Sequence, residues 1–192
     1  MDDRMVWAGT GGGPLIALPA ELASHWRGVE GACHSPRDRD GWREGLDFSG
    51  TDYGRACRID GYLGTLEVGT GRALILNDEP MPTAFLPRAG GGLLVRWMYA
   101  EDEGEVLRAV RSIPESTWEA TPHGIVASRA GVLLFDSAYP GDDLPTSPGE
   151  VASSPWLRLA LPAGTYDVDT ADHAPDEATR LILHRIRKTI SR

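Results

Sequence analysis

Two of the histidines and both cysteines lie in the first sixty residues, where they could supply four metal ligands: His25, Cys33, His34 and Cys57. No two of them have the Cys-x-x-Cys or His-x-x-x-His spacing that lets a pair of ligands reach one ion from a single turn. We therefore expect no metal site. Cys57 is interpreted instead as a small buried residue.

Residues for nucleophilic catalysis and phosphate binding are also poorly arranged. Ser137, Ser153 and Ser154 lack the Gly-x-Ser-x-Gly context that exposes a nucleophile on a sharp turn. The glycine-rich segment 9–14 lacks the lysine and hydroxyl residue of a phosphate loop, and Pro14 replaces the last glycine of a dinucleotide fingerprint. The sequence predicts no catalytic residue and no cofactor.

Acidic side chains are the chemistry that the sequence concentrates. Between Ala130 and Glu177 one base, Arg158, accompanies a run of acids: Asp136, Asp142, Asp143, Glu150, Asp167, Asp169, Asp172, Asp176 and Glu177. Such a run is either the solvated face of an acidic protein or a patch that speeds association with a basic partner. On the second interpretation the candidate interface residues are Asp136, Asp142, Asp143, Asp167, Asp169 and Asp172.

Three more residues are singled out by their surroundings. Trp42 lies in a polar, arginine-rich segment, where an exposed tryptophan would be a binding hot spot, so it joins the candidate interface. Arg96 lies in the middle of one apolar segment and Asp136 at the end of another. We expect these two to form a buried structural ion pair, with a place at an interface as the alternative.

Short strands and turns must position these residues. Glycine and proline, 23 and 14 residues, interrupt regular elements throughout the chain. Hairpins are predicted around Gly69-Thr70-Gly71-Arg72 and Pro162-Ala163-Gly164. Residues 93–100 are apolar on both alternating faces, which indicates a central strand. Further strands are predicted at 15–18, 117–120, 124–128 and 132–139.

Helical signals are few. Asp102 is a good N-cap with an apolar stripe behind it, so a helix is predicted over about 102–113. Pro19 can begin a short N-terminal helix. Residues 28–51 are expected to be a loop, and the segment from Thr179 to Ile190 fits a strand or a helix, with the strand favoured over its first half. The expected fold class is α+β, a mostly antiparallel sheet of short strands and hairpins with these two helices, in one domain over residues 1–192.

Composition narrows the function. The net charge of −9 disfavours nucleic-acid binding, which needs a basic face, and is compatible with a basic protein partner. The N-terminus lacks the layout of a signal peptide, and no apolar run approaches the length of a membrane span. Two cysteines make a poor disulfide framework. We expect a cytoplasmic protein.

Several segments together are similar to the immunity proteins of bacterial polymorphic toxin systems, specifically family 21. They include Gly12-Gly13-Pro14-Leu15-Ile16, Asp52-Tyr53-Gly54-Arg55-Ala56-Cys57, Tyr62-Leu63-Gly64, Asp78-Glu79-Pro80, Arg96-Trp97-Met98-Tyr99-Ala100 and Phe135-Asp136-Ser137-Ala138-Tyr139-Pro140-Gly141, with a closing segment from Gly164 to Arg185. The resemblance implies an α+β domain without catalytic activity or cofactor, made beside a toxin that it neutralises. It assigns no contact residues.

The expected function is therefore occlusion of a cognate toxin encoded nearby, with acidic side chains matching a basic surface such as a nuclease uses. The alternative is a small-molecule-binding or regulatory domain without catalysis, with a pocket lined by Arg96, Trp97 and Tyr99. A deep cavity or a co-purified ligand would favour the alternative.

Overall fold

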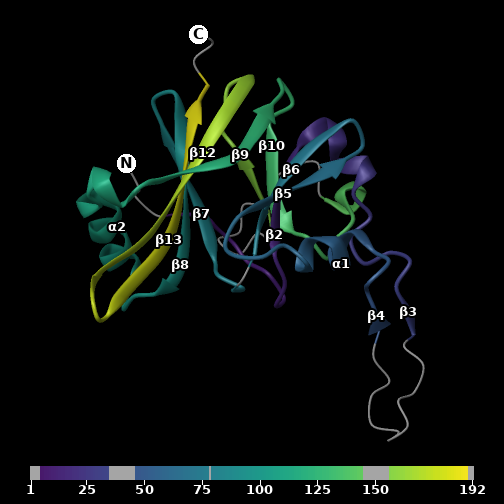
Figure 1. Cartoon of the computed structure of the whole chain (residues 1–192), viewed down its shortest axis with the longest axis horizontal. Coiled ribbons are helices and arrows are strands. Elements are labelled where there is room, and N and C mark those ends of the chain that lie inside the picture. Colours follow the sequence, from purple (N-terminus) through teal and green to yellow (C-terminus); the bar gives the residue numbers. More distant parts are fainter. Residues whose placement is uncertain (1–4, 35–45, 78, 145–155, 190–192) are drawn as a thin grey trace, which may run out of the picture.

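Two antiparallel sheets pack face to face in the computed structural model of the chain (Figure 1). The structure describes residues 5–34, 46–77, 79–144 and 156–189. The six-stranded sheet has the order β1 (Trp7–Ala8), β7 (Thr83–Arg88), β8 (Gly91–Tyr99), β13 (Thr179–Lys188), β12 (Gly164–Asp176) and β9 (Glu119–Ala127). The five-stranded sheet has the order β11 (Trp156–Leu159), β10 (Val132–Asp136), β2 (Leu15–Pro19), β6 (Gly71–Leu76) and β5 (Gly64–Val68). A two-residue pair, β3 (Cys33–His34) and β4 (Leu46–Asp47), projects from this body (Figure 1).

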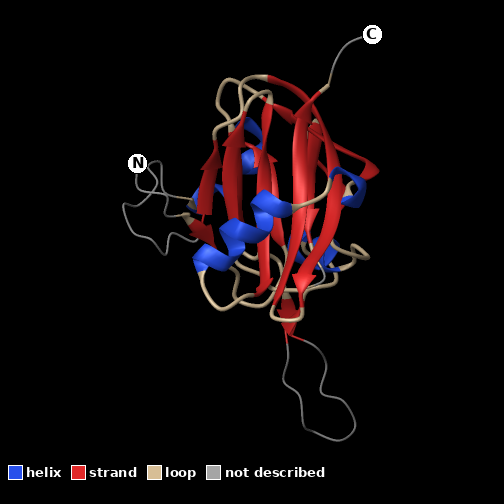
Figure 2. Ribbon diagram, turned by 90° about the vertical axis from the view of Figure 1, so that its left-hand side faces the viewer, coloured by secondary structure: helices blue, strands red, loops and turns tan. Residues whose placement is uncertain are grey.

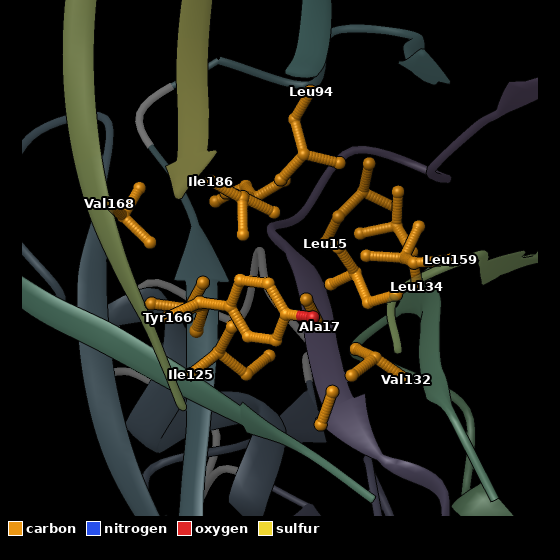
Figure 3. Close-up of a cluster of buried hydrophobic side chains, with 14 of the residues drawn as sticks. Leu15, Ala17, Leu94, Ile125, Val132, Leu134, Leu159, Tyr166, Val168 and Ile186 are labelled. Carbon is orange, nitrogen blue, oxygen red and sulfur yellow. The ribbon is translucent and has the colours of Figure 1, made fainter. Parts of the chain in front are cut away.

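Apolar side chains from both sheets fill the space between them. Figure 3 shows Leu15 and Leu134 of the five-stranded sheet pointing toward Tyr166 and Ile186 of the six-stranded sheet. The strands β2 and β10 are buried along their whole length, because apolar side chains cover the outer face of their sheet as well. This layered packing is the arrangement expected when two sheets each hide an apolar face.

Helices cover the two outer faces. The helix α2 (Glu103–Ser112) lies across the six-stranded sheet (Figure 2), where Val106 and Val110 pack on Leu183. The 3-10 helix η1 (Ala20–His25) and the short helix α1 (Asp52–Cys57) pack on the five-stranded sheet through their own buried apolar residues. Two more 3-10 turns, η2 (Glu115–Thr117) and η3 (Gly141–Asp143), complete the outer layers. None of the described helices is long and apolar enough to cross a bilayer.

The α+β class expected from the sequence is wrong. Strands take 49% of the described residues and helices 17%, and α2 alone among the described helices exceeds six residues. The capping signal at Asp102 is real, since its side chain accepts a hydrogen bond from the Glu105 N–H at 2.9 Å. The expected N-terminal helix is only a 3-10 turn without a side-chain cap. Short helices on the outer faces leave a fold that is mostly antiparallel sheet.

The last segment is a strand throughout, from Thr179 to Lys188. Leu181 and Leu183 pack under α2 on the outer face, whereas Ile186 belongs to the core between the sheets. The apolar residues of this segment thus alternate between the two faces of the sheet, with the period of two of a strand and not the period of a helix.

The register brings chain segments that are far apart in sequence to one end of the sandwich. Leu15 pairs with Leu76 and with Asp136, so the start of β2 lies beside the ends of β6 and β10. In the other sheet Tyr99, at the end of β8, pairs with Arg180 at the start of β13. The connections that follow these positions therefore meet at a common end.

Candidate functional site

Asp136 fastens the glycine-rich loop to the end of β10. Its side chain is only 4% exposed, and its carboxylate accepts hydrogen bonds from the N–H groups of Gly11 at 2.8 Å and Ala138 at 2.9 Å. The neighbouring Ser137 hydroxyl donates to the Pro14 carbonyl oxygen at 2.7 Å. A carboxylate held by backbone donors in this way is a structural anchor, not a free interface charge.

Arg96 is buried between the sheets, and it does not meet Asp136. Its guanidinium donates to the carbonyl oxygens of Tyr62 at 3.1 Å, Asn77 at 2.9 Å and Glu79 at 2.9 Å. The ion pair between Arg96 and Asp136 that was expected from the sequence is therefore wrong. Arg96 lies on a strand of the six-stranded sheet and turns toward the connections beside β5 and β6, while backbone N–H groups already occupy the carboxylate of Asp136.

Asp169 is also buried, at the centre of an ion network on the outer face of the six-stranded sheet. Its carboxylate accepts hydrogen bonds from Arg185 (Nη2 at 2.9 Å) and from Arg187 (Nη2 at 3.0 Å). Arg185 in turn pairs with Glu115 and lies over the ring of Trp118, 4.5 Å from its centroid. The hydrogen bonds to Asp169 raise the pKa of Arg187 above its ordinary value. Asp169 on β12 and Arg185 on β13 therefore both have ion-pair partners within the chain.

The remaining acids of the candidate interface are dispersed. Asp142 and Asp143 lie in η3, which packs beside η1 on the flank of the five-stranded sheet. Asp167 is exposed near the start of β12, and Asp172 is exposed farther along the same strand. Trp42 lies outside the described residues. The candidate residues therefore do not form one surface.

A different set of acids does gather, at the end of the sandwich described above. We call it the acidic end, and its members are all exposed: Asp60, Glu79, Glu101, Asp102, Asp172, Asp176 and Glu177. They come from the connection before β5, the connection between β6 and β7, the start of α2 and the β12–β13 hairpin (Figure 1). The opposite end carries exposed bases, Arg72, Arg88, Arg129, Arg158, Arg187 and Lys188, of which Arg72 pairs with Glu67 and Arg187 with Asp169. Exposed acids without an ion-pair partner in the described structure therefore gather at one end of the strands, and exposed bases such as Arg88 and Arg129 lie at the other.

Exposed aromatic surface accompanies the acidic end. Tyr99 is 43% exposed at the end of β8, where its partner in the ladder is Arg180. Arg180 forms a bidentate pair with Asp172, at 2.6 and 2.9 Å. This pairing, with smaller contributions from Tyr62 and Tyr99, raises the pKa of Arg180. Aromatic rings among unpaired carboxylates suit a protein interface that has a basic partner.

Tyr53 packs beneath the glycine-rich loop next to this end. A Cβ added at Gly13 would lie 2.5 Å from the ring of Tyr53, so a larger residue at this position would force that ring to move. Burial raises the pKa of Tyr53 to about 12, and a hydrogen bond with Cys57 and the charge of Asp136 act in the same direction. The expectation that Cys57 is buried is wrong, because the side chain is exposed at the end of α1.

Among the described residues, neither a metal site nor a cavity contributes to the acidic end. No group of three His, Cys, Asp or Glu residues in the described part of the chain could hold a metal ion. A cavity of about 720 Å³ opens between the edge strands β9 and β5, with Leu22, Ile125 and Tyr166 among its lining residues. The pocket expected around Arg96, Trp97 and Tyr99 is not this one. Arg96 faces the interior, while Trp97, the next residue, packs with the outer-face cluster and Trp7.

Comparison with known families identifies the chain. The family model described as Immunity protein 21 matches residues 6–179, and the chain therefore belongs to this family of immunity proteins. No curated protein and no solved structure matches the chain.

The six segments between Gly12 and Gly141 that resemble the family converge in the structure. Contacts between them include the hydrogen bond of Ser137 to Pro14, the packing of Tyr53 against Gly13 and the hydrogen bond of Arg96 to Tyr62. All three contacts lie at or next to the acidic end. Sequence reasoning missed Asp60, Glu79, Glu101 and Asp102 as a group, because they belong to three different connections. The available signal was that all of them directly follow or precede predicted strands and the predicted helix.

Proposed function

We propose that the chain binds its cognate toxin, a protein encoded nearby, and neutralises it by occlusion, without a reaction of its own, in the cytoplasm of the producing cell. Membership of the immunity protein family supports the class of function. The observation that favours this surface is the acidic end, where exposed carboxylates surround the 43% exposed ring of Tyr99.

The chemistry of this end indicates a basic partner. Its carboxylates, Asp172 excepted, have no ion-pair partner among the described residues, so their field extends into solvent. Such a field steers a cationic protein toward the end that carries it, and the exposed bases at the opposite end orient the approach. A toxin that binds a polyanion, as a nuclease does, would present the matching surface.

The buried polar groups behind this surface support binding rather than catalysis. Arg96 and Asp136 are engaged by backbone groups, and these contacts fix the shape of the connections in front of them. A reaction centre would instead leave an acid, a base or a nucleophile directed at an open cleft.

The direct test uses the toxin domain encoded next to this gene. Co-expression should protect cells from the toxin, and the two purified proteins should form a complex. The double variant Glu101→Lys/Glu177→Lys reverses two exposed charges that make no hydrogen bond or ion pair in the described structure. We expect it to slow association at least tenfold at low salt, because the attraction is electrostatic.

The matched control is Arg88→Glu/Arg129→Glu, which reverses two exposed charges at the basic end. It should leave association unchanged or make it slightly faster. If the chain neither protects cells nor binds the neighbouring toxin, the proposed function is wrong. If it binds and the two double variants behave alike, the acidic end is not the interface.

A second candidate function rests on the cavity between β9 and β5. Its volume of about 720 Å³ falls in the range of small-molecule sites, and apolar residues share its walls with polar ones, among them Thr70 and His123. Native mass spectrometry of the purified chain tests this candidate. A bound mass that disappears on denaturation would support a ligand site, and a bare chain that no metabolite mixture stabilises thermally would argue against it.

A further inference from the structure

Arg96 connects the core of the sandwich to the acidic end. It lies on β8, paired with Thr83 on β7 and Ile182 on β13, and is only 1% exposed. From this central position its guanidinium extends from the inner face of the six-stranded sheet toward the connections beside β5 and β6. Three of its acceptors are the carbonyl oxygens of Tyr62, Asn77 and Glu79.

These acceptors belong to two connections that have little regular structure of their own. Tyr62 lies between α1 and β5, and Asn77 and Glu79 lie between β6 and β7. The Asn77 side chain donates to the carbonyl oxygen of Ile59, which joins the two connections to each other. A single buried cation therefore holds the segments that present Asp60 and Glu79 at the surface.

The need for a guanidinium follows from the geometry. Its two terminal nitrogens donate in fixed directions, so it can bind carbonyl oxygens from both connections at once, at 2.9 to 3.1 Å. The neighbouring inner-face residue His184 is fully buried, and its Nδ1 lies 2.9 Å from the Thr170 hydroxyl.

We propose that Arg96 is a positioning residue for toxin binding: it holds the α1–β5 and β6–β7 connections in the shape that docks the toxin, without touching the toxin itself. The proposal rests on the proposed function. A preformed surface binds more tightly than one that must be ordered during association, so loss of the clamp weakens the complex. A residue that serves stability alone would not affect a complex measured well below the unfolding temperature.

The test compares Arg96→Lys and Arg96→Met with Leu159→Ala, a core variant near the basic end. All three should lower Tm. Affinity for the neighbouring toxin domain is measured at a temperature where circular dichroism shows each variant fully folded. We expect Kd to rise at least tenfold for Arg96→Met, less for Arg96→Lys, and to stay at the wild-type value for Leu159→Ala. Amide hydrogen exchange in the free Arg96→Lys chain should speed up at residues 59–62 and 77, because a lysine amine cannot make the hydrogen bonds that the two terminal nitrogens of the guanidinium make.

Each outcome decides one claim. Wild-type affinity in folded Arg96→Met, or in folded Arg96→Lys with the same exchange rates as wild type, overturns the positioning role. If Arg96→Met does not fold, Arg96→Lys still answers the question, because it keeps the charge. A wild-type chain that binds no toxin refutes the proposed function instead, and the exchange measurement still shows whether Arg96 orders the two connections.

Discussion

The strand β12 carries acids into two regions that treat them in opposite ways. On the outer face of the six-stranded sheet, Asp169 is 4% exposed and lies between two arginines of β13. A few residues farther along, Asp176 and Glu177 are exposed in the β12–β13 hairpin. In the amino-acid sequence the two groups look alike, but only the second projects its charge into solvent.

The difference arises from what lies across the ladder. Asp169 pairs in register with Arg185, and η2 closes the network through Glu115. In the hairpin at the acidic end Arg180 pairs with Asp172, but among the described residues the Asp176 carboxylate has the Ala178 N–H, at 2.9 Å, as its one hydrogen-bond donor. Acids at the centre of a sheet thus become structural, and acids at its ends remain able to attract a partner.

Removing Asp169 should have the largest effect on stability. The substitution Asp169→Ala leaves Arg185 without its buried carboxylate, and loss of one partner of a buried pair costs about 3–5 kcal/mol. Because Arg187 is half-exposed, water compensates in part, and we expect about 2–3 kcal/mol. Urea unfolding measures this change. Asp167→Ala, an exposed residue on the same strand, should stay within about 0.5 kcal/mol of wild type. Equal losses in the two variants would contradict the distinction.

His184, on the inner face of β13, should have an effect of intermediate size, which appears as a dependence of stability on pH. Arg185 finds a carboxylate on the outer face, whereas the adjacent His184 faces Thr170 and Arg96 between the sheets. Burial, with the charge of Arg96, holds the pKa of His184 well below 6.5. Below pH 6.5 the unfolded chain binds a proton that the folded chain does not, so stability falls as pH falls. The slope should approach 1.4 kcal/mol per pH unit for one group.

The free energy of unfolding, measured from pH 8 to pH 5 for wild type and His184→Gln, isolates this contribution. Glutamine cannot titrate, so the part of the slope due to His184 should vanish in the variant. The pKa of His123 is also lowered by burial, and it contributes in the same direction in both proteins. Identical pH profiles would mean that His184 is not kept neutral by the fold.

The strands were more predictable from the sequence than the surface was. The hairpin around Gly69-Thr70-Gly71-Arg72, the central strand over 93–100 and the helix after Asp102 each follow from local patterns, and the structure places them there. The hairpin predicted around Pro162-Ala163-Gly164 is wrong, because β11 pairs with β10 in one sheet and β12 pairs with β9 and β13 in the other. The prediction of the fold class was wrong because local patterns indicate single helices and strands but not the share of the chain that each takes. The Arg96–Asp136 pairing failed because polar partners are set by register, and backbone carbonyl oxygens leave no trace in a sequence.

The candidate interface depended on register in the same way. A run of acids from Ala130 to Glu177 looked like one patch, but Asp136 and Asp169 are buried, and Asp142 lies on the flank of the other sheet. The acids that do gather are separated by up to 117 positions in the chain, from Asp60 to Glu177. Only the meeting of strand ends shows that they share a surface.

Removing an arginine should affect stability in one region and association in the other, and this gives the smallest but most specific effect. Arg185 supports the buried Asp169, so Arg185→Gln should lower Tm. Arg180 lies among the carboxylates of the acidic end, in an exposed pair with Asp172. Exposed pairs contribute little to folding, so Arg180→Gln should leave Tm unchanged. It also makes this end more negative, so association with the neighbouring toxin domain should become a few-fold faster at low salt and return to the wild-type rate at high salt. Stopped-flow mixing at two ionic strengths measures this, and a slower association in Arg180→Gln would show that Arg180 contacts the toxin directly.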